Sequence, residues 1–139
     1  EKNYLKKIKR KNIKILGFQS DQVIKNMMEH CRAFVYAGTE DFGIAPVEAM
    51  AAGAPVIGLE KGGITDTVKC INTENNNATG VFFKSTQVEE ICQCIEWFED
   101  KKIWKKFKPS ELNKWASKFN EDNFSIQLKD FINKAQPNL

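Results

Sequence analysis

The sequence lacks several features that would assign it to a specialised class of protein. No apolar run approaches the roughly 20 residues that a membrane-spanning helix needs, and the charged start at Glu1, Lys2 and Asn3 is unlike a signal peptide. The net charge is only +3, so nothing in the overall charge calls for a nucleic-acid partner. We therefore expect a cytoplasmic protein, with the inner face of a membrane as an alternative location.

Patterns for metal ligands and disulfides are also missing. The four cysteines are Cys31, Cys70, Cys92 and Cys94, and they show no paired metal-binding spacing. Cys92 and Cys94 lie two apart on an expected helix and point to different faces, which favours reduced thiols. The only histidine, His30, ends a predicted helix, where pairing with the helix dipole is expected rather than catalysis.

What is present is an ordinary globular composition with alternating strand and helix patterns. The chain has 139 residues, of which 42% are hydrophobic and 28% charged, enough for one domain with a buried core. Strands are predicted at residues 13–17, 33–36, 55–59 and 80–83, and helices at 21–30, 46–52, 86–99, 111–119 and 124–132. This order predicts an α/β fold, a doubly wound parallel sheet with about five or six strands.

Residues 33–63 contain the most informative pattern. The apolar run 33–36 predicts a buried strand, and a glycine-flanked acidic loop, 38–43, follows it. Pro46 fits the first position of a helix, and Gly53 fits the left-handed residue just past its end. A second buried strand is predicted at 55–59, so the stretch forms a βαβ unit with parallel neighbouring strands.

Two loops of this unit should flank one crevice, because both leave the carboxyl ends of parallel strands. Glu40 lies in the first loop and Glu48 in the predicted first turn of the helix. Carboxylates accept hydrogen bonds, so they suit sugar and ribose hydroxyls, whereas the free N–H groups at a helix start suit a phosphate. The structural alternatives are that Glu48 caps its own helix and that the glycines are ordinary turn residues.

The spacing of these residues resembles a known signature. Glu40 and Glu48 are separated by seven residues, with Phe42-Gly43-Ile44 between them and EAMAAGAPVI over 48–57. This pattern resembles the donor-binding domain of retaining GT-B glycosyltransferases (glycosyltransferase family 4, or glycosyl transferases group 1). The run EDFGI over 40–44, with Val47 and Glu48 and the later run GVFF over 80–83, is most similar to the mannosyltransferase-like branch. The resemblance implies that residues 1–139 are the C-terminal, Rossmann-like half, with the N-terminal acceptor domain absent.

The resemblance also implies roles for individual residues. Glu40 is the catalytic candidate and contacts the hydroxyls of the donor sugar, and Glu48 binds the ribose. The segment implied to contact sugar and phosphate is Asp41, Phe42, Gly43 and Ile44. The glycines implied to approach the donor are Gly62 and Gly63. Weaker candidates near the nucleotide base are Gly17 and Phe18. Asp66 stands where the family usually has Glu, which leaves the role of that position open.

The implied reaction moves a hexose, mannose favoured, from a nucleotide diphosphate sugar to an acceptor hydroxyl with retention of configuration. The donor would be GDP-mannose, with a UDP-sugar as the alternative, and no metal or cofactor is implied. The acceptor would be a glycan or lipid-linked glycan, as in cell-envelope polysaccharide, lipopolysaccharide or glycolipid synthesis. The family's diphosphate-binding Arg and Lys come from an upstream segment that nothing here matches, so the chain alone should bind the donor weakly.

Two other functions remain open. One is a non-catalytic nucleotide-sugar binding domain that acts with a partner. The other is a basic membrane-surface adaptor, because residues 2–14 combine seven basic side chains with an apolar stripe at Tyr4, Leu5 and Ile8. The structural alternative is that this stripe packs on the sheet, and nucleic acid is not expected as a partner.

The C-terminal third is rich in aromatic residues. Trp104, Phe107, Trp115 and Phe119 could stack on sugars, but packing between helices is the simpler expectation. The final helix should expose apolar surface if the acceptor domain is absent. Residues 72–79 are polar and predict a surface loop.

Overall fold

The computed structural model describes residues 2–71 and 77–135, so most of the loop predicted at 72–79 lies outside the described residues. The described strands form one parallel sheet in the order β1 (Phe34–Tyr36), β2 (Val56–Leu59) and β3 (Gly80–Phe83). In its register Val35 lies opposite Ile57, and Ile57 lies opposite Val81. The predicted α/β, Rossmann-like class is confirmed.

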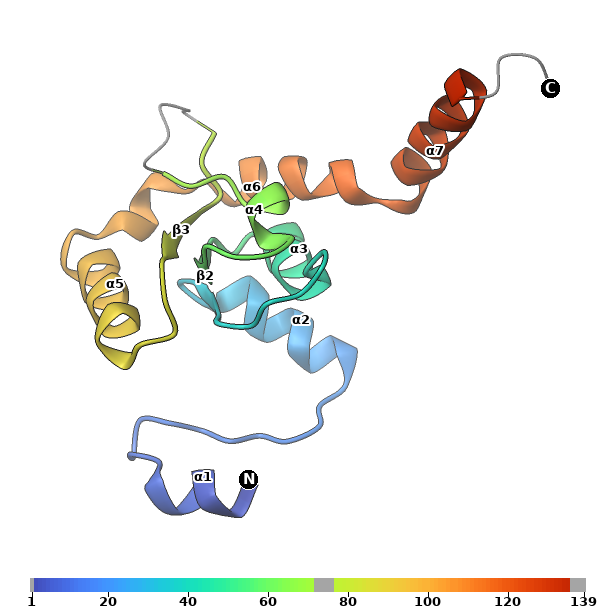
Figure 1. Ribbon diagram of the computed structural model, residues 1–139. Helices are drawn as coiled ribbons and strands as arrows, with labels where there is room; N and C mark the ends of the chain where they lie inside the picture. The colour runs from blue at the N-terminus through green and yellow to red at the C-terminus, as the bar shows by residue number, and fades with distance from the viewer. Residues whose placement is uncertain (1, 72–76, 136–139) are drawn as a thin grey trace.

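Helices flank this sheet (Figure 1). The helical elements are α1 (Lys2–Ile8), α2 (Asp21–His30), α3 (Ile44–Ala51), α4 (Ile64–Thr67), α5 (Val88–Asp100), η1 (Ile103–Lys106), α6 (Pro109–Ala116), η2 (Ser117–Phe119) and α7 (Glu121–Ala135). Helix α3 packs on β1, β2 and α6, while α5 packs on β3. In Figure 1, α5 lies on one side of the strands, and α2 and α3 lie on the other.

The hydrophobic core is centred on β2, all of whose residues are buried. Phe98 of α5 and Leu112 of α6 are each 1% exposed, and Met50 of α3 is fully buried. A Cβ atom on Gly58 would lie 2.4 Å from Cδ1 of Ile64, so the glycine is what lets α4 approach the sheet. The strand predicted at 55–59 is therefore the centre of the packed structure.

The number of strands predicted from the sequence was wrong. The described residues form three strands rather than five or six, and the segment 13–17 is not one of them. It runs as an extended connection, with Ile13 and Leu16 each 46% exposed. A strand needs a hydrogen-bonding neighbour, and this connection runs below the body of the molecule, away from the sheet (Figure 1). For the same reason β1 is an edge strand, and Val35 is 46% exposed instead of buried.

The start of α3 differs from the prediction, whereas its end agrees. The helix begins at Ile44, after Gly43 in the left-handed conformation (φ 81°), so Pro46 is its third residue. Proline is tolerated there because the first four N–H groups of a helix have no partner inside it. Glu48 consequently lies in the second turn. Gly53 (φ 92°) follows the end of the helix in the left-handed conformation, as predicted.

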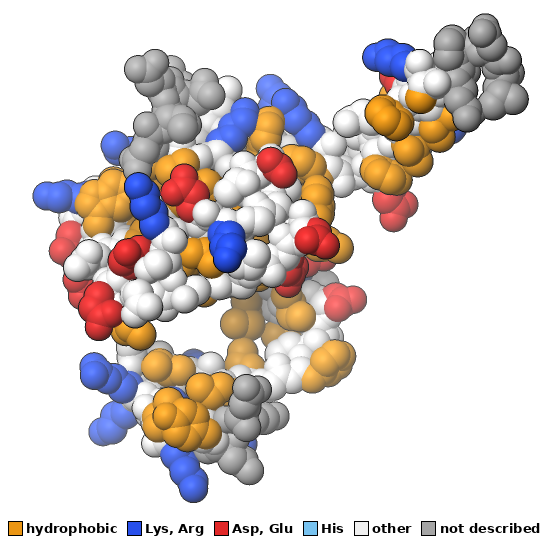
Figure 2. Space-filling view, in the orientation of Figure 1, with side chains coloured by type: hydrophobic (Ala, Val, Ile, Leu, Met, Phe, Trp, Pro, Cys, Tyr) orange, Lys and Arg blue, Asp and Glu red, His pale blue; other side chains and the backbone are white. Residues whose placement is uncertain are grey.

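The two ends of the chain extend from the body (Figure 1). The structural alternative for α1, in which its apolar stripe packs on the sheet, is not observed, because Tyr4 is 65% and Ile8 is 56% exposed. The apolar face predicted for α2 is also partly open, with Met27 49% exposed. Helix α7 exposes apolar surface in the same way, with Phe131 70% exposed. Figure 2 shows hydrophobic side chains on the surface over both ends of the chain.

Candidate functional site

The loops that follow β1 and β2 lie against each other, as the βαβ pattern predicted. The backbone N–H of Gly63 donates to the carbonyl oxygen of Glu40 at 2.8 Å. A Cβ atom on Gly63 would lie 2.0 Å from the carbonyl oxygen of Asp41. One on Gly62, which has a φ of 78°, would lie 2.7 Å from the oxygen of Glu40. The two glycines are thus required for this close approach. We call residues 38–43 and 60–63 the paired loops.

Glu40 carries an exposed carboxylate at the first of the paired loops. Its neighbour is Tyr36, the last residue of β1. Hydrogen bonding to the Glu40 side chain, desolvation and the adjacent negative charge raise the pKa of Tyr36 above its ordinary value. The Tyr36 ring also covers Gly38, where a Cβ atom would lie 3.0 Å from the ring. Sequence reasoning missed Tyr36, because the strand pattern marks it only as an apolar position.

Glu48 lies on α3 and borders a groove. It is exposed and lines a groove of about 920 Å³ between α2, α3 and the start of α6. No side chain caps the start of α3, so the structural alternative for Glu48 is not observed. Glu40 is not among the residues that line this groove. The structure therefore brings Glu40 together with Gly62 and Gly63. Glu48 lies in the second turn of α3 and lines the groove.

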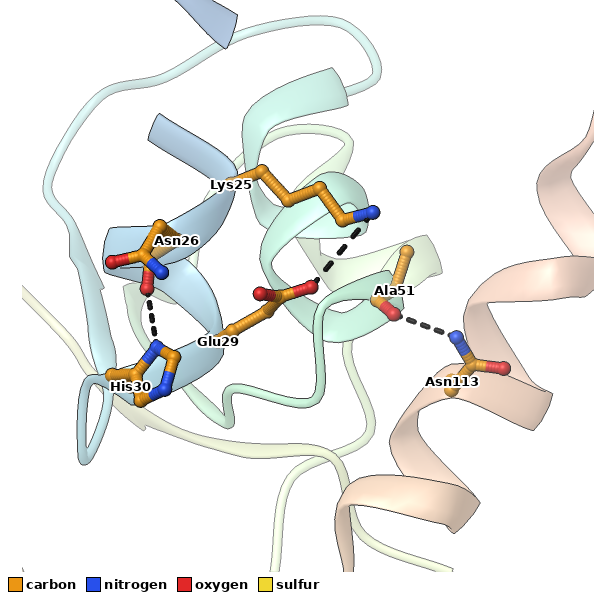
Figure 3. A network of polar contacts seen from close by, with 6 residues as sticks. All are labelled: Lys25, Asn26, Glu29, His30, Ala51 and Asn113. Carbon is orange, nitrogen blue, oxygen red and sulfur yellow. Dashed lines mark hydrogen bonds and ion pairs between the residues drawn. The ribbon is translucent and has the colours of Figure 1, made fainter. Parts of the chain in front are cut away.

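Polar contacts occur on the helices that form the groove beside Glu48 (Figure 3). On α2, Nζ of Lys25 lies 3.8 Å from Oε1 of Glu29, and Nδ1 of His30 donates to the carbonyl oxygen of Asn26 at 2.8 Å. Between α6 and α3, Nδ2 of Asn113 donates to the carbonyl oxygen of Ala51 at 2.6 Å and ties α6 to the end of α3. Of the residues drawn in Figure 3, Lys25, Glu29, Ala51 and Asn113 line the groove, whereas Asn26 and His30 do not.

The turn between the two glutamates combines a buried glycine with exposed apolar side chains. Gly43 is buried, whereas Phe42 is 45% and Ile44 is 64% exposed. The ring of Phe42 meets that of Phe119 edge-on, with centroids 5.8 Å apart. Phe119 in turn meets Trp115 at 5.7 Å. The predicted packing role of these two aromatic residues is thus confirmed, but their contact with the paired loops was not foreseen.

The candidates for the nucleotide base lie elsewhere on the chain. Gly17 (φ 72°) and Phe18 belong to the connection that leads into α2. The side chain of Phe18 is 98% exposed, so its ring rests on no other part of the described chain. The structure does not bring these residues to the paired loops.

The remaining titratable groups do not form a metal centre in the described chain. Within residues 2–71 and 77–135, no three His, Cys, Asp or Glu side chains are arranged to hold a metal ion. The four cysteines are thiols, and burial raises the pKa of Cys31 and, with Cys70 nearby, that of Cys94. None of the described helices has the length and apolar content needed to cross a bilayer.

Comparison with known proteins defines the class. Residues 1–119 match the model of the family described as glycosyl transferases group 1, and the chain belongs to that family. No curated protein matches it. Among solved structures, sucrose-phosphate synthase from Thermosynechococcus elongatus is similar, with a TM-score of 0.55 and 22% sequence identity. The match covers 73% of this chain and 25% of that structure. The fold is that of a GT-B glycosyltransferase, and the chain spans about a quarter of the neighbour's length.

Proposed function

We propose that this chain is the donor-binding domain of a retaining glycosyltransferase that transfers a hexose from a nucleotide diphosphate sugar to an acceptor hydroxyl. The family match over residues 1–119 carries the proposal. The hydrogen bond between Gly63 and Glu40 supports it, since it brings the paired loops together at the carboxyl ends of β1 and β2. That edge of a parallel sheet is where ligands bind in open α/β folds.

In this proposal, Glu40 accepts hydrogen bonds from the hydroxyls of the donor sugar. Its exposed position leaves the carboxylate accessible, and the Tyr36 hydroxyl limits its orientation. The backbone amides from Asp41 to Ile44 approach sugar and phosphate, supported by the unpartnered N–H groups at the start of α3. Gly62 and Gly63 leave room for the donor.

Glu48 would hold the ribose from the neighbouring turn of α3. It is exposed and makes no helix cap, so its carboxylate can accept hydrogen bonds from a diol. The nucleotide base would then extend from Glu48, and Gly17 and Phe18 could reach it only if their connection moved toward the body. The donor we favour is GDP-mannose, with a UDP-sugar as the alternative, and we assign no metal.

The reaction also needs parts that these residues do not supply. Positive charge must offset the diphosphate as it leaves with the nucleotide, and we assign that charge to a segment upstream of residue 1. The acceptor, a glycan or lipid-linked glycan, would be held by an N-terminal domain. Within a cell, cell-envelope polysaccharide or glycolipid synthesis fits such an acceptor.

Calorimetric titration with GDP-mannose and UDP-glucose tests the donor assignment. We expect weak binding by the unaltered chain and a loss of about tenfold or more in affinity for Glu40→Gln, because removing an ionised acceptor weakens a charged hydrogen bond by about 1.5–3 kcal/mol. Glu121→Gln on α7 is the matched control and should bind like the unaltered chain. Equal affinity of Glu40→Gln and the unaltered chain would contradict the role of Glu40.

A second candidate function is attachment to an anionic membrane surface through α1. The exposure of Tyr4, Leu5 and Ile8 favours it, because an exposed apolar stripe flanked by lysines is typical of helices that lie on such surfaces. Sedimentation with vesicles containing phosphatidylserine checks this. The expected result is binding that disappears when residues 1–12 are removed, and binding that persists would exclude α1 as the attachment.

A further inference from the structure

Aromatic residues more than 70 positions away in the chain reach the first of the paired loops. Phe119 of η2 meets Phe42 with ring centroids 5.8 Å apart and planes at 71°. Both this contact and the next one, from Phe119 to Trp115 at 5.7 Å and 82°, have the edge-to-face geometry that aromatic rings prefer. The rings of Phe42, Phe119 and Trp115 therefore form one connected row.

Trp115 is fixed at the far end of this row. Its indole Nε1 donates to the carbonyl oxygen of Thr67 at 2.7 Å, and Thr67 ends α4 as a fully buried residue. Nζ of Lys69 lies 3.6 Å from the indole centroid, and Nζ of Lys118 lies 4.5 Å from it. Two ammonium groups thus already lie over the indole, so it serves as an anchor for the row and not as an open stacking platform for a sugar.

The row of rings connects the first of the paired loops, through Trp115 and α4, to the second. Helix α4, which holds Trp115 through Thr67, directly follows Gly63. The N–H of Gly63 donates to Glu40 at 2.8 Å, and Glu40 lies two residues before Phe42. The first loop is therefore held on one side by the backbone of the second loop and on the other by Phe119. No other element contributes a ring contact to Phe42 in the part of the chain that the structure describes.

We propose that Phe119, anchored by Trp115, is a positioning residue that sets the orientation of the Phe42–Gly43 turn and thereby the donor affinity of the site. The inference rests on the proposed function for its effect on binding. Phe119 touches no donor itself. It acts through Phe42, whose backbone amide belongs to the segment assigned to sugar and phosphate. Gly43 (φ 81°) has no side chain with which to pack, so the ring contact between Phe42 and Phe119 is the side-chain contact that restrains this turn.

The test compares four variants at two phenylalanines. Phe119→Ala removes the ring, Phe119→Leu keeps apolar bulk without the ring edge, and Phe119→Tyr restores the ring. Phe124→Ala on the exposed face of α7 is the control. Each is titrated with GDP-mannose and UDP-glucose, and the amide NMR signals of residues 42–44 are recorded without ligand.

We expect Phe119→Ala and Phe119→Leu to weaken donor binding about tenfold, in line with the upper range for an aromatic pair. They should also shift the amide signals of residues 42–44 and speed their hydrogen exchange. Phe119→Tyr and Phe124→Ala should match the unaltered chain in both measurements. A general loss of packing would not be rescued by Phe119→Tyr, and it would not be confined to these amides.

Unchanged binding and unchanged amide signals in Phe119→Ala would overturn the inference, and Glu40→Gln in the same titration would still report on the proposed function. If the unaltered chain bound neither nucleotide sugar, the proposed function would fail instead. The ligand-free amide signals would then decide the positioning role by themselves: a shift confined to 42–44 supports it, and no shift overturns it.

Discussion

The body of the molecule, residues 33–119, and its two terminal helices both carry large apolar side chains, but they differ in what covers them. In the body, Phe98 stacks on Phe107 with centroids 6.2 Å apart and is 1% exposed. On α7, Phe124 is 64% exposed. Both phenylalanines lie on amphipathic helices, so the helical pattern alone does not distinguish a buried face from an open one.

The difference indicates where stability and where binding reside. Burial of apolar area contributes about 25 cal/mol per Å², so the body accounts for the free energy of unfolding, and α1 and α7 contribute little. The paired loops lie in the body and are held by backbone contacts from Gly63. The open faces of α1 and α7 are available to other surfaces. Five changes of decreasing effect test this division.

The largest contrast should come from deleting one phenylalanine in each region. Phe98→Ala should lower the free energy of unfolding by about 3–5 kcal/mol, because it leaves a cavity in the core. Phe124→Ala should change it by less than about 0.5 kcal/mol, as is usual for surface positions. Urea denaturation measures both, and equal effects would remove the distinction between body and ends.

The second-largest effect is expected from adding a methyl group between the paired loops. Gly63→Ala forces its Cβ against the carbonyl oxygen of Asp41, 2.0 Å away, and should destabilise the chain by about 1–3 kcal/mol. It should also abolish donor binding. Gly38→Ala is the control for stability only: its Cβ meets the Tyr36 side chain at 3.0 Å, and because that side chain can move, the loss in free energy of unfolding should be smaller. Normal donor affinity of Gly63→Ala in calorimetry would contradict the packing of the loops.

A smaller loss is expected on removing the indole N–H of Trp115. Trp115→Phe keeps a ring beside Phe119 but deletes the hydrogen bond to the carbonyl oxygen of Thr67. It should cost about 0.5–1.5 kcal/mol in urea denaturation, the usual net value of one hydrogen bond. Trp104→Phe, on the half-buried surface of η1, serves as the matched control. A larger loss for Trp104→Phe would mean that the α4 anchor is misassigned.

The contact between Tyr36 and Glu40 should appear as a pH effect. The pKa of Tyr36 is raised in the folded chain, so this contact stabilises the fold while the phenol is protonated, below its ordinary pKa near ~10. The contribution disappears as the pH rises through the raised pKa. NMR titration of the Tyr36 ring should show the pKa falling toward its ordinary value in Glu40→Gln. An unchanged pKa of Tyr36 in Glu40→Gln would show that Glu40 does not cause the shift.

The smallest effect is expected at the N-terminus. Removal of residues 1–12 takes away α1, whose apolar stripe is exposed, and should leave the midpoint of thermal unfolding unchanged within error. A drop of several degrees would show that α1 packs on the body in solution, as the alternative reading of its stripe proposed.

The sequence was most informative where local signals and tertiary packing agree. Gly53 and Pro55 predicted the end of α3 and the start of β2, because a left-handed residue and a proline act locally. The strand at 13–17 was predicted from its apolar residues alone, and it failed because strand formation depends on a neighbour that local sequence does not specify. The start of α3 was misplaced because Pro46 is tolerated anywhere in the first turn.

The candidate site could be predicted only in part, for a related reason. Residues close in sequence, such as Glu40 and Gly43, were found from their spacing, and the βαβ rule brought Gly63 to them. Tyr36 and Phe119 were missed as neighbours of this loop. The direction of a strand-end side chain and a contact across 77 positions, from 42 to 119, follow from the packed structure and leave no local pattern.

The most direct test of the account is to map where a nucleotide sugar binds. Amide NMR signals are recorded while GDP-mannose, and separately UDP-glucose, is added to the unaltered chain. The account predicts shifts concentrated at residues 40–44 and 62–63, with smaller ones beside Glu48, and none on α7. Shifts confined to α5 or α7, or the absence of shifts with either nucleotide sugar, would contradict a donor site built on the paired loops.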